Sequence, residues 1–143
     1  MRPVVFALAL TFVSGAAYAD IAPPEPDASE GVWHGSMRQV DADGEKSYPM
    51  TLTLTEDGGT TDYPKLKCGG ELQRLSSASG GYVVYKETIT RGGFDRGKGE
   101  GCVDGVIKLH SEADEIVLGW FGVFDGDPML ASARLTRGRS NAR

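Results

Sequence analysis

The strongest constraint on the fold is the run of residues 48–55, in which Tyr, Met and two Leu residues alternate with Pro and three Thr residues. A period of two is typical of a half-buried β-strand, and other stretches rich in β-branched and aromatic residues predict further strands. Clusters of Gly, Asp and Ser, the residues of tight turns, separate these stretches. Short strands at this spacing, with almost no helix, predict an all-β antiparallel meander that closes into a barrel or a sandwich. The predicted strands are residues 32–40, 48–55, 66–75, 82–90, 106–110, 115–124 and 129–137, with an eighth if residues 71–75 pair separately.

Residues 1–19 have the three parts of a secretory signal peptide. Arg2 is followed by an apolar run from Val4 to Val13 and by the small-residue cleavage site Ala17-Tyr18-Ala19. The apolar run is shorter than the roughly 20 residues that a membrane-spanning helix needs, and no later segment is apolar enough to span a membrane. We therefore expect these residues to be removed and the mature chain to be periplasmic or secreted.

Removal of 19 of the 143 residues leaves 124, which is enough for one domain with a single core. Without Arg2 the 15 basic residues fall to 14, against 20 acidic ones, so the formal net charge becomes −6. An acidic chain does not fit nucleic-acid binding, which depends on neutralising phosphates. Residues 20–30, rich in Pro and acidic side chains, predict a disordered arm, and residues 138–143 predict a flexible basic tail. The β-domain is expected to span residues 31–137.

The chain has two cysteines, and in an exported protein these favour one structural disulfide, Cys68–Cys102. A zinc site needs three or four ligands at short spacing, and neither His34 nor His110 lies near a cysteine in the sequence. A redox pair would usually have C-x-x-C spacing. We therefore expect no metal and no cofactor.

The surroundings of Cys68 predict its place in the sheet. On the predicted strand order, Cys68 opens the third strand and Cys102 precedes the fifth. Tyr63-Pro64 predicts a bend before the strand, because proline cannot occupy a central ladder. Gly69-Gly70 predicts a bulge or a close backbone approach beside the sulfur.

Gly31-Val32-Trp33 resembles the G-x-W signature that opens calycin barrels, the lipocalins and avidins. In those folds the Trp plugs one barrel end and a late Arg packs over it. The resemblance therefore implies a lipocalin-like barrel in which Arg134 or Arg137 makes a cation–π contact with Trp33.

A longer pattern, from Trp33 to Arg137, is similar to a small extracytoplasmic β-domain of exported bacterial proteins and of the outer segments of some bacterial serine/threonine kinases. The pattern consists of Y-P-x-L-x-C-x-G-x-L from residue 63, Y-x-E-x-I-T-x-G from residue 85, Cys102, G-x-I-x-L from residue 105, and Trp120. This resemblance implies a disulfide-tied barrel with no established chemistry, so it transfers no catalytic residue.

Several short motifs have simpler interpretations as turns or chance pairs. Residues 41–45 begin like a calcium loop, but the twelfth position would be Leu52 within a strand, so a hairpin turn is expected. The glycine-rich residues 97–101 lack the following helix of a phosphate-binding loop. Ser36 and His34 share a strand face without the G-x-S-x-G motif of a hydrolase. We therefore expect that the protein is not an enzyme.

Glu87 is a carboxylate that would be partly buried if its face of the predicted strand points inward. Alternation places Tyr85, Glu87 and Ile89 together on one face. A buried carboxylate must be paired or hydrogen-bonded, and we expect Arg38, Arg134 or a backbone N–H as its partner. Glu87 would then be either part of the scaffold or the polar anchor of a ligand cavity, and the sequence leaves both roles open.

These features predict an exported non-enzymatic protein that binds a small apolar ligand in the barrel or a protein partner at its rim. A lysozyme-type inhibitor is one alternative, because Ser79-Gly80-Gly81-Tyr82 resembles the S-G-x-x-Y loop of such inhibitors, with Lys86 following. A structural envelope protein with a filled interior is the other, since a small barrel either fills its interior with side chains or holds one ligand. The oligomeric state stays open. The candidate ligand-lining or barrel-plug residues are Trp33, Tyr48, Tyr85, Glu87, Trp120 and Arg134.

Overall fold

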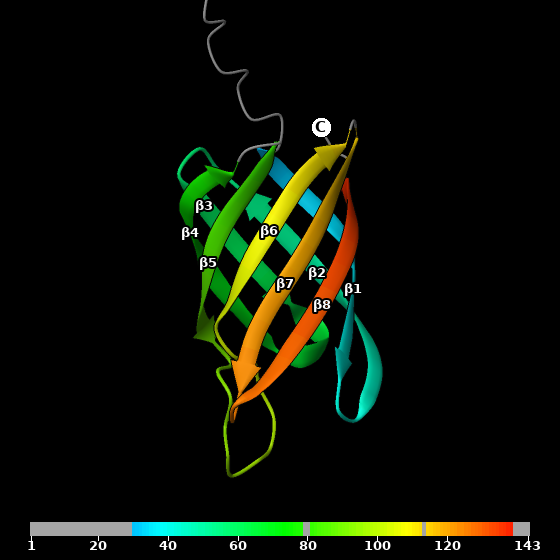
Figure 1. Cartoon of the computed structure of the whole chain (residues 1–143), viewed down its shortest axis with the longest axis vertical. Coiled ribbons are helices and arrows are strands. Elements are labelled where there is room, and N and C mark those ends of the chain that lie inside the picture. Colours follow the sequence, from blue (N-terminus) through cyan, green and yellow to red (C-terminus); the bar gives the residue numbers. More distant parts are fainter. Residues whose placement is uncertain (1–29, 79–80, 113, 139–143) are drawn as a thin grey trace, which may run out of the picture.

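The predicted meander closes into a barrel of eight antiparallel strands (Figure 1). The computed structural model describes residues 30–78, 81–112 and 114–138; the predicted signal peptide, all but Glu30 of the predicted arm and all but Gly138 of the predicted tail lie outside them. Each strand pairs with the next along the chain, and β8 pairs with β1 to close the barrel. The predicted fold class is therefore confirmed. The strands are β1 (Gly31–Asp41), β2 (Gly44–Leu54), β3 (Gly58–Tyr63), β4 (Cys68–Ala78), β5 (Tyr82–Arg91), β6 (Gly105–Glu112), β7 (Glu115–Phe124) and β8 (Asp127–Arg137).

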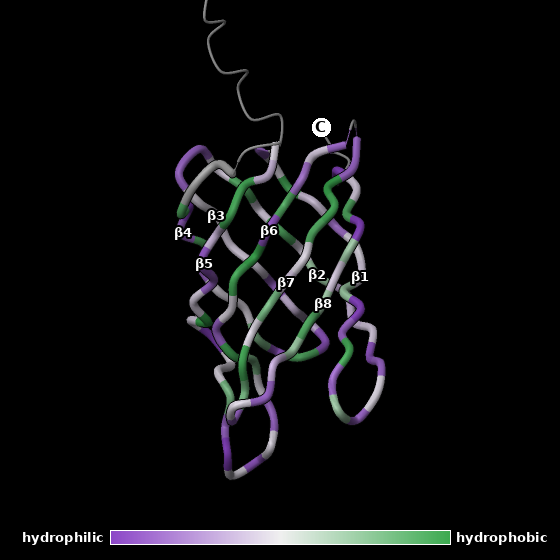
Figure 2. Tube along the Cα trace, viewed as in Figure 1, coloured by the Kyte–Doolittle hydropathy of each residue, from purple (hydrophilic) through white to green (hydrophobic). Residues whose placement is uncertain are grey.

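The period of two in the sequence determines which side chains fill the barrel. On β2, Tyr48, Met50, Leu52 and Leu54 are all buried, while the residues between them face outward. Figure 2 shows the same alternation of hydrophobic and hydrophilic residues along other strands. Tyr85 and Glu87 are both buried on β5, as their shared face predicts. Among the described residues, no helix is both long and apolar enough to span a bilayer.

The eighth strand is β3, and the expectation that residues 71–75 pair separately is wrong. Those residues lie within the continuous strand β4. The glycines that open β3 look like a turn in the sequence, but they belong to the sheet because neighbouring backbone lies so close. A Cβ at Gly58 would lie 2.2 Å from the Leu72 carbonyl oxygen, and one at Gly59 would lie 2.0 Å from the Thr53 carbonyl oxygen.

The predicted bend and bulge around Cys68 are both present. Pro64–Leu66 forms one turn of 3₁₀ helix that ends at Lys67 in the left-handed conformation, with φ of 55°. The pairing of β4 with β5 shifts register between Gly69 and Gly70. Because β3 adds a strand, Cys68 opens the fourth strand rather than the third, and Cys102 precedes the sixth rather than the fifth.

Trp33 plugs the end of the barrel where β1 begins and β8 ends, which we call the tryptophan end. The Trp33 ring is buried, and the Arg137 guanidinium lies 4.4 Å from its centroid. Arg134, the other candidate, does not take part. Inward positions on β8 are odd-numbered, so Arg134 faces solvent, where its guanidinium lies 3.2 Å from Glu115 and 3.6 Å from Glu112.

The disulfide Cys68–Cys102 ties the first residue of β4 to the end of the long loop of residues 92–104. Both cysteines of the chain are used in this bond. The loop lies at the lower end of the barrel in Figure 1, opposite the end where β1 begins and β8 ends. Its base is closed by hydrogen bonds from the Cys102 N–H to the Gly92 carbonyl and from the Phe94 N–H to the Cys102 carbonyl.

We expect the double substitution Cys68→Ala/Cys102→Ala to lower the free energy of unfolding by about 3–4 kcal/mol, because the bond closes a loop with a sequence separation of 34. Urea unfolding of both proteins, with and without reductant, measures the difference. Reductant should destabilise the wild type and leave the double variant unchanged. Equal stability of the two proteins without reductant would contradict this account.

Candidate functional site

The barrel interior is hollow at the end opposite Trp33, which we call the cavity end. The cavity there has a volume of about 730 Å³. Its walls come from the β1–β2 and β7–β8 hairpins, the 3₁₀ turn and the loop 92–104. Side chains from the middle of the barrel, among them Met37 and Glu87, line it as well.

The cavity wall is largely aromatic and apolar, and its charged groups lie mostly at the rim. Rings and thioethers provide the apolar wall, from Met37, Tyr48, Tyr63, Phe94, Trp120, Phe124 and Met129. Asp43, Lys46 and Asp127 are exposed rim residues, and Asp41 is half-buried. The Lys46 ammonium lies 3.0 Å from the Asp41 carboxylate, and this hydrogen bond is the main cause that lowers the pKa of Asp41.

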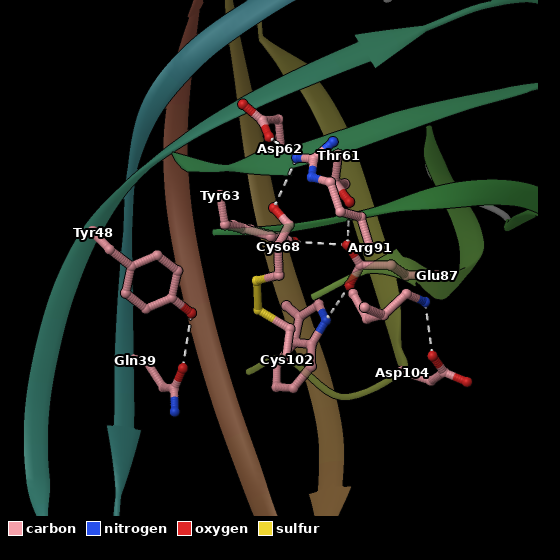
Figure 3. The surroundings of a disulfide bond; sticks show 12 residues. Gln39, Tyr48, Thr61, Asp62, Tyr63, Cys68, Glu87, Arg91, Cys102 and Asp104 are labelled. Carbon is pink, nitrogen blue, oxygen red and sulfur yellow. Dashed lines mark hydrogen bonds and ion pairs between the residues drawn. A yellow bond between two sulfur atoms is a disulfide. The ribbon is translucent and has the colours of Figure 1, made fainter. Parts of the chain in front are cut away.

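Glu87 is 1% exposed and accepts three hydrogen bonds from uncharged donors. The Thr61 hydroxyl and the Tyr63 hydroxyl donate to its Oε1 at 2.5 Å and 2.8 Å. The Trp120 indole N–H donates to its Oε2 at 2.7 Å. Figure 3 shows Glu87 with Thr61 and Tyr63 in the surroundings of the disulfide. Strands β3, β5 and β7 thus meet at one carboxylate inside the barrel.

The prediction that Arg38 or Arg134 pairs with Glu87 is wrong. Both arginine side chains face outward, and Arg38 pairs with Glu45 at 2.6 Å. Even-numbered positions of β1 and β8 face solvent, so neither arginine can reach an inward carboxylate. Neutral donors from β3 and β7 satisfy it instead.

Trp120 reaches Glu87 because its indole lies against two glycines. Gly105 on β6 and Gly122 on β7 are paired across the strands. A Cβ at Gly105 would lie 2.4 Å from the Trp120 Nε1, and one at Gly122 would lie 2.2 Å from its Cη2. The missing side chains leave room for the ring to lie along the barrel wall with its N–H directed at the carboxylate.

Burial keeps the two cavity tyrosines protonated. It raises the pKa of Tyr63 far above its usual value, and the Glu87 charge adds to the effect. Burial, with the charges of Glu87 and Asp41, raises the pKa of Tyr48 to about 12. Both phenols therefore act as donors at neutral pH. The Tyr48 hydroxyl donates to the Gln39 side-chain oxygen at 2.8 Å, and the two rings meet edge to face at a centroid distance of 6.0 Å.

The loop 92–104 is held against the β7–β8 turn at the mouth of the cavity. The Phe94 and Phe124 rings have centroids 4.3 Å apart. The Arg96 guanidinium binds both carboxylate oxygens of Asp125, at 2.6 Å and 3.2 Å. These contacts and the disulfide fix the loop at both sides, so it forms a defined wall.

The structure brings together three of the six predicted site residues. Tyr48, Glu87 and Trp120 line the cavity, whereas Trp33 plugs the opposite end. Tyr85 is buried in the core, outside the cavity wall, and Arg134 is on the outer surface.

Thr61 and Tyr63 donate hydrogen bonds to Glu87, and the sequence did not predict either of them as its partner. Both lie on β3, which was not predicted as a strand. Their spacing of two places both on the inner face, and this alternation could have identified them once residues 58–63 were recognised as a strand.

The remaining motifs of the sequence form turns, loops and surface positions, and residues of the 41–45 and 97–101 motifs lie at the rim of the cavity. Residues 42–43 form the two-residue turn of the β1–β2 hairpin. The His34 ring is exposed and its Nδ1 lies 3.0 Å from the Thr51 hydroxyl. In the part of the chain that the structure describes, no three His, Cys, Asp or Glu side chains are grouped so as to hold a metal. Of the inhibitor-like motif, Ser79 lies outside the described residues and Lys86 is exposed on β5.

Comparison of the chain with protein-family models, with curated proteins and with solved structures finds no match. The fold and the site therefore define the class by themselves. It is a closed eight-stranded antiparallel meander barrel with one disulfide, with one end plugged and a cavity at the other.

We expect Gly122→Ala to displace the Trp120 indole and to lower the free energy of unfolding by about 1–3 kcal/mol, because the new methyl group overlaps the ring. Tryptophan fluorescence and urea unfolding measure the two effects. Gly119→Ala is the matched control on the same strand, since a Cβ there meets no atom within 4 Å. If both variants behave like the wild type, the indole does not depend on this glycine.

Proposed function

We propose that the protein is an exported, non-enzymatic binding protein that holds one small, largely apolar molecule at the cavity end of its barrel. The observation that carries the proposal is the cavity of about 730 Å³. This volume lies within the range of roughly 300–1,000 Å³ that is typical of ligand pockets. It also disfavours the alternative of a structural protein with a filled interior, because only the tryptophan end is packed.

The composition of the wall supports the same function. Ligand pockets are mostly apolar and aromatic, with a few fixed polar groups that orient the ligand. Here the polar groups are held by one another: Glu87 by its three donors, and Gln39 by Tyr48. Groups fixed in this way suit recognition. An acid or base in catalysis must instead exchange protons with a substrate.

Export is supported by the signal pattern in residues 1–19 and by the disulfide, since such bonds persist in oxidising compartments. We assign the chain by proposal to the small extracytoplasmic barrel domains that it resembles. The ligand of this protein would enter at the mouth formed by the hairpins and the loop 92–104.

The neutral fluorescent probe N-phenyl-1-naphthylamine tests the binding proposal. The oxidised mature protein should bind one equivalent with increased probe emission. Val103→Trp should weaken binding by about tenfold or more, because Val103 lines the cavity and a larger side chain occupies it.

Val106→Trp is the matched control, because Val106 lies three residues further along the chain on the outer face of β6 and is exposed. This variant should bind the probe like the wild type. Failure of the wild type to bind, or equal weakening by both substitutions, would overturn the proposal of a ligand in this cavity.

A further inference from the structure

In the part of the chain that the structure describes, no cationic side chain hydrogen-bonds to the Glu87 carboxylate. Its three donors, Thr61, Tyr63 and Trp120, are all neutral. A carboxylate removed from water is stabilised most strongly by a positively charged donor. The three neutral donors satisfy the hydrogen-bonding capacity of the carboxylate in part. None of them carries a positive charge that would balance its negative charge.

The three donors fill three of the acceptor positions of the Glu87 carboxylate. A carboxylate has about four acceptor positions, two on each oxygen. Oε1 accepts from Thr61 and Tyr63, while the Trp120 indole occupies one position on Oε2. Glu87 is part of the cavity wall, so the cavity is the side from which a further donor would reach the carboxylate.

The rings beside Glu87 favour a cation as that donor. Tyr48, Tyr63 and Trp120 line the same cavity. The faces of such rings attract ammonium and guanidinium groups within about 6 Å, and Trp and Tyr are the strongest of them. Aromatic walls around a carboxylate thus suit the positive group and the apolar body of one ligand.

The charges at the rim of the cavity also favour a positively charged ligand. Among the described residues of the cavity wall, Lys46 is the basic one, and its ammonium is already paired with Asp41. Asp43 and Asp127 add two exposed negative charges at the mouth. Like charges at the mouth and at Glu87 disfavour an anionic ligand such as a fatty acid, and they attract a cation.

We propose that the ligand of this cavity is an organic cation, a protonated amine on an apolar or aromatic body, whose ammonium group donates to Glu87 between the rings of Tyr48, Tyr63 and Trp120. This inference rests on the proposed function and names its ligand class. It makes Glu87 the residue that determines specificity.

Three probes that share a phenylbutyl body test the inference: phenylbutylamine, phenylbutanol and phenylbutanoate. Each is titrated into the oxidised mature protein by calorimetry at neutral pH and by displacement of N-phenyl-1-naphthylamine. The ammonium should bind at least about tenfold more tightly than the alcohol, and the carboxylate should bind most weakly.

Glu87→Gln should remove the preference for the ammonium and retain binding of the alcohol. Glu71→Gln, the same substitution at an exposed position of β4 outside the cavity wall, should change the ammonium affinity by less than about threefold, because exposed charges are screened. If Glu87→Gln does not fold, the ranking of the three probes on the wild type still decides the question.

Equal binding of the amine and the alcohol, or tighter binding of the carboxylate, would overturn the cation inference. Binding of N-phenyl-1-naphthylamine in the same samples would then leave the proposed function standing. If neither that probe nor any phenylbutyl compound binds, the proposed function fails together with the inference.

Discussion

The desolvation of Glu87 is the constraint on which the arrangement of this barrel depends. A carboxylate that is 1% exposed must receive hydrogen bonds, and its donors come from β3 and β7 while Glu87 itself is on β5. None of these three strands pairs with another of them in the barrel. The carboxylate therefore connects separate parts of the wall through the interior. It does so at the level where the packed core ends and the cavity begins.

The two ends of the barrel differ because their residues differ in size and polarity. Toward Trp33, aliphatic side chains such as Leu52 and Ile116 are fully buried and fill the interior. Toward the other end, polar hairpin residues and the loop 92–104 form the rim, and the Trp120 indole lies flat on Gly105 and Gly122. A ring that lies along the wall leaves the axis of the barrel free. The disulfide and the Arg96–Asp125 pair then keep the loop in place beside the mouth.

Local pattern was enough to predict the strand faces, and long-range pairing was not predictable. Alternation placed Glu87 on the same strand face as Tyr85, and the G-x-W resemblance implied a plug at Trp33. Alternation also explains why Arg137, and not Arg134, covers that plug. The glycines of β3 concealed a strand, because their role is a close backbone approach that only the folded sheet reveals. The donors to Glu87 lie 24 to 33 residues away along the chain, so no local pattern connects them with it.

Methyl NMR of the methionines tests most directly whether the cavity end accepts a ligand. Besides Met1, the chain has three methionines: Met37 and Met129 line the cavity, whereas Met50 is buried outside its wall. With ¹³C-methyl methionine labelling, addition of N-phenyl-1-naphthylamine should shift the Met37 and Met129 signals in a saturable manner and leave Met50 nearly unchanged. Shifts absent from all three signals, or as large for Met50 as for the other two, would contradict a ligand site at this end of the barrel.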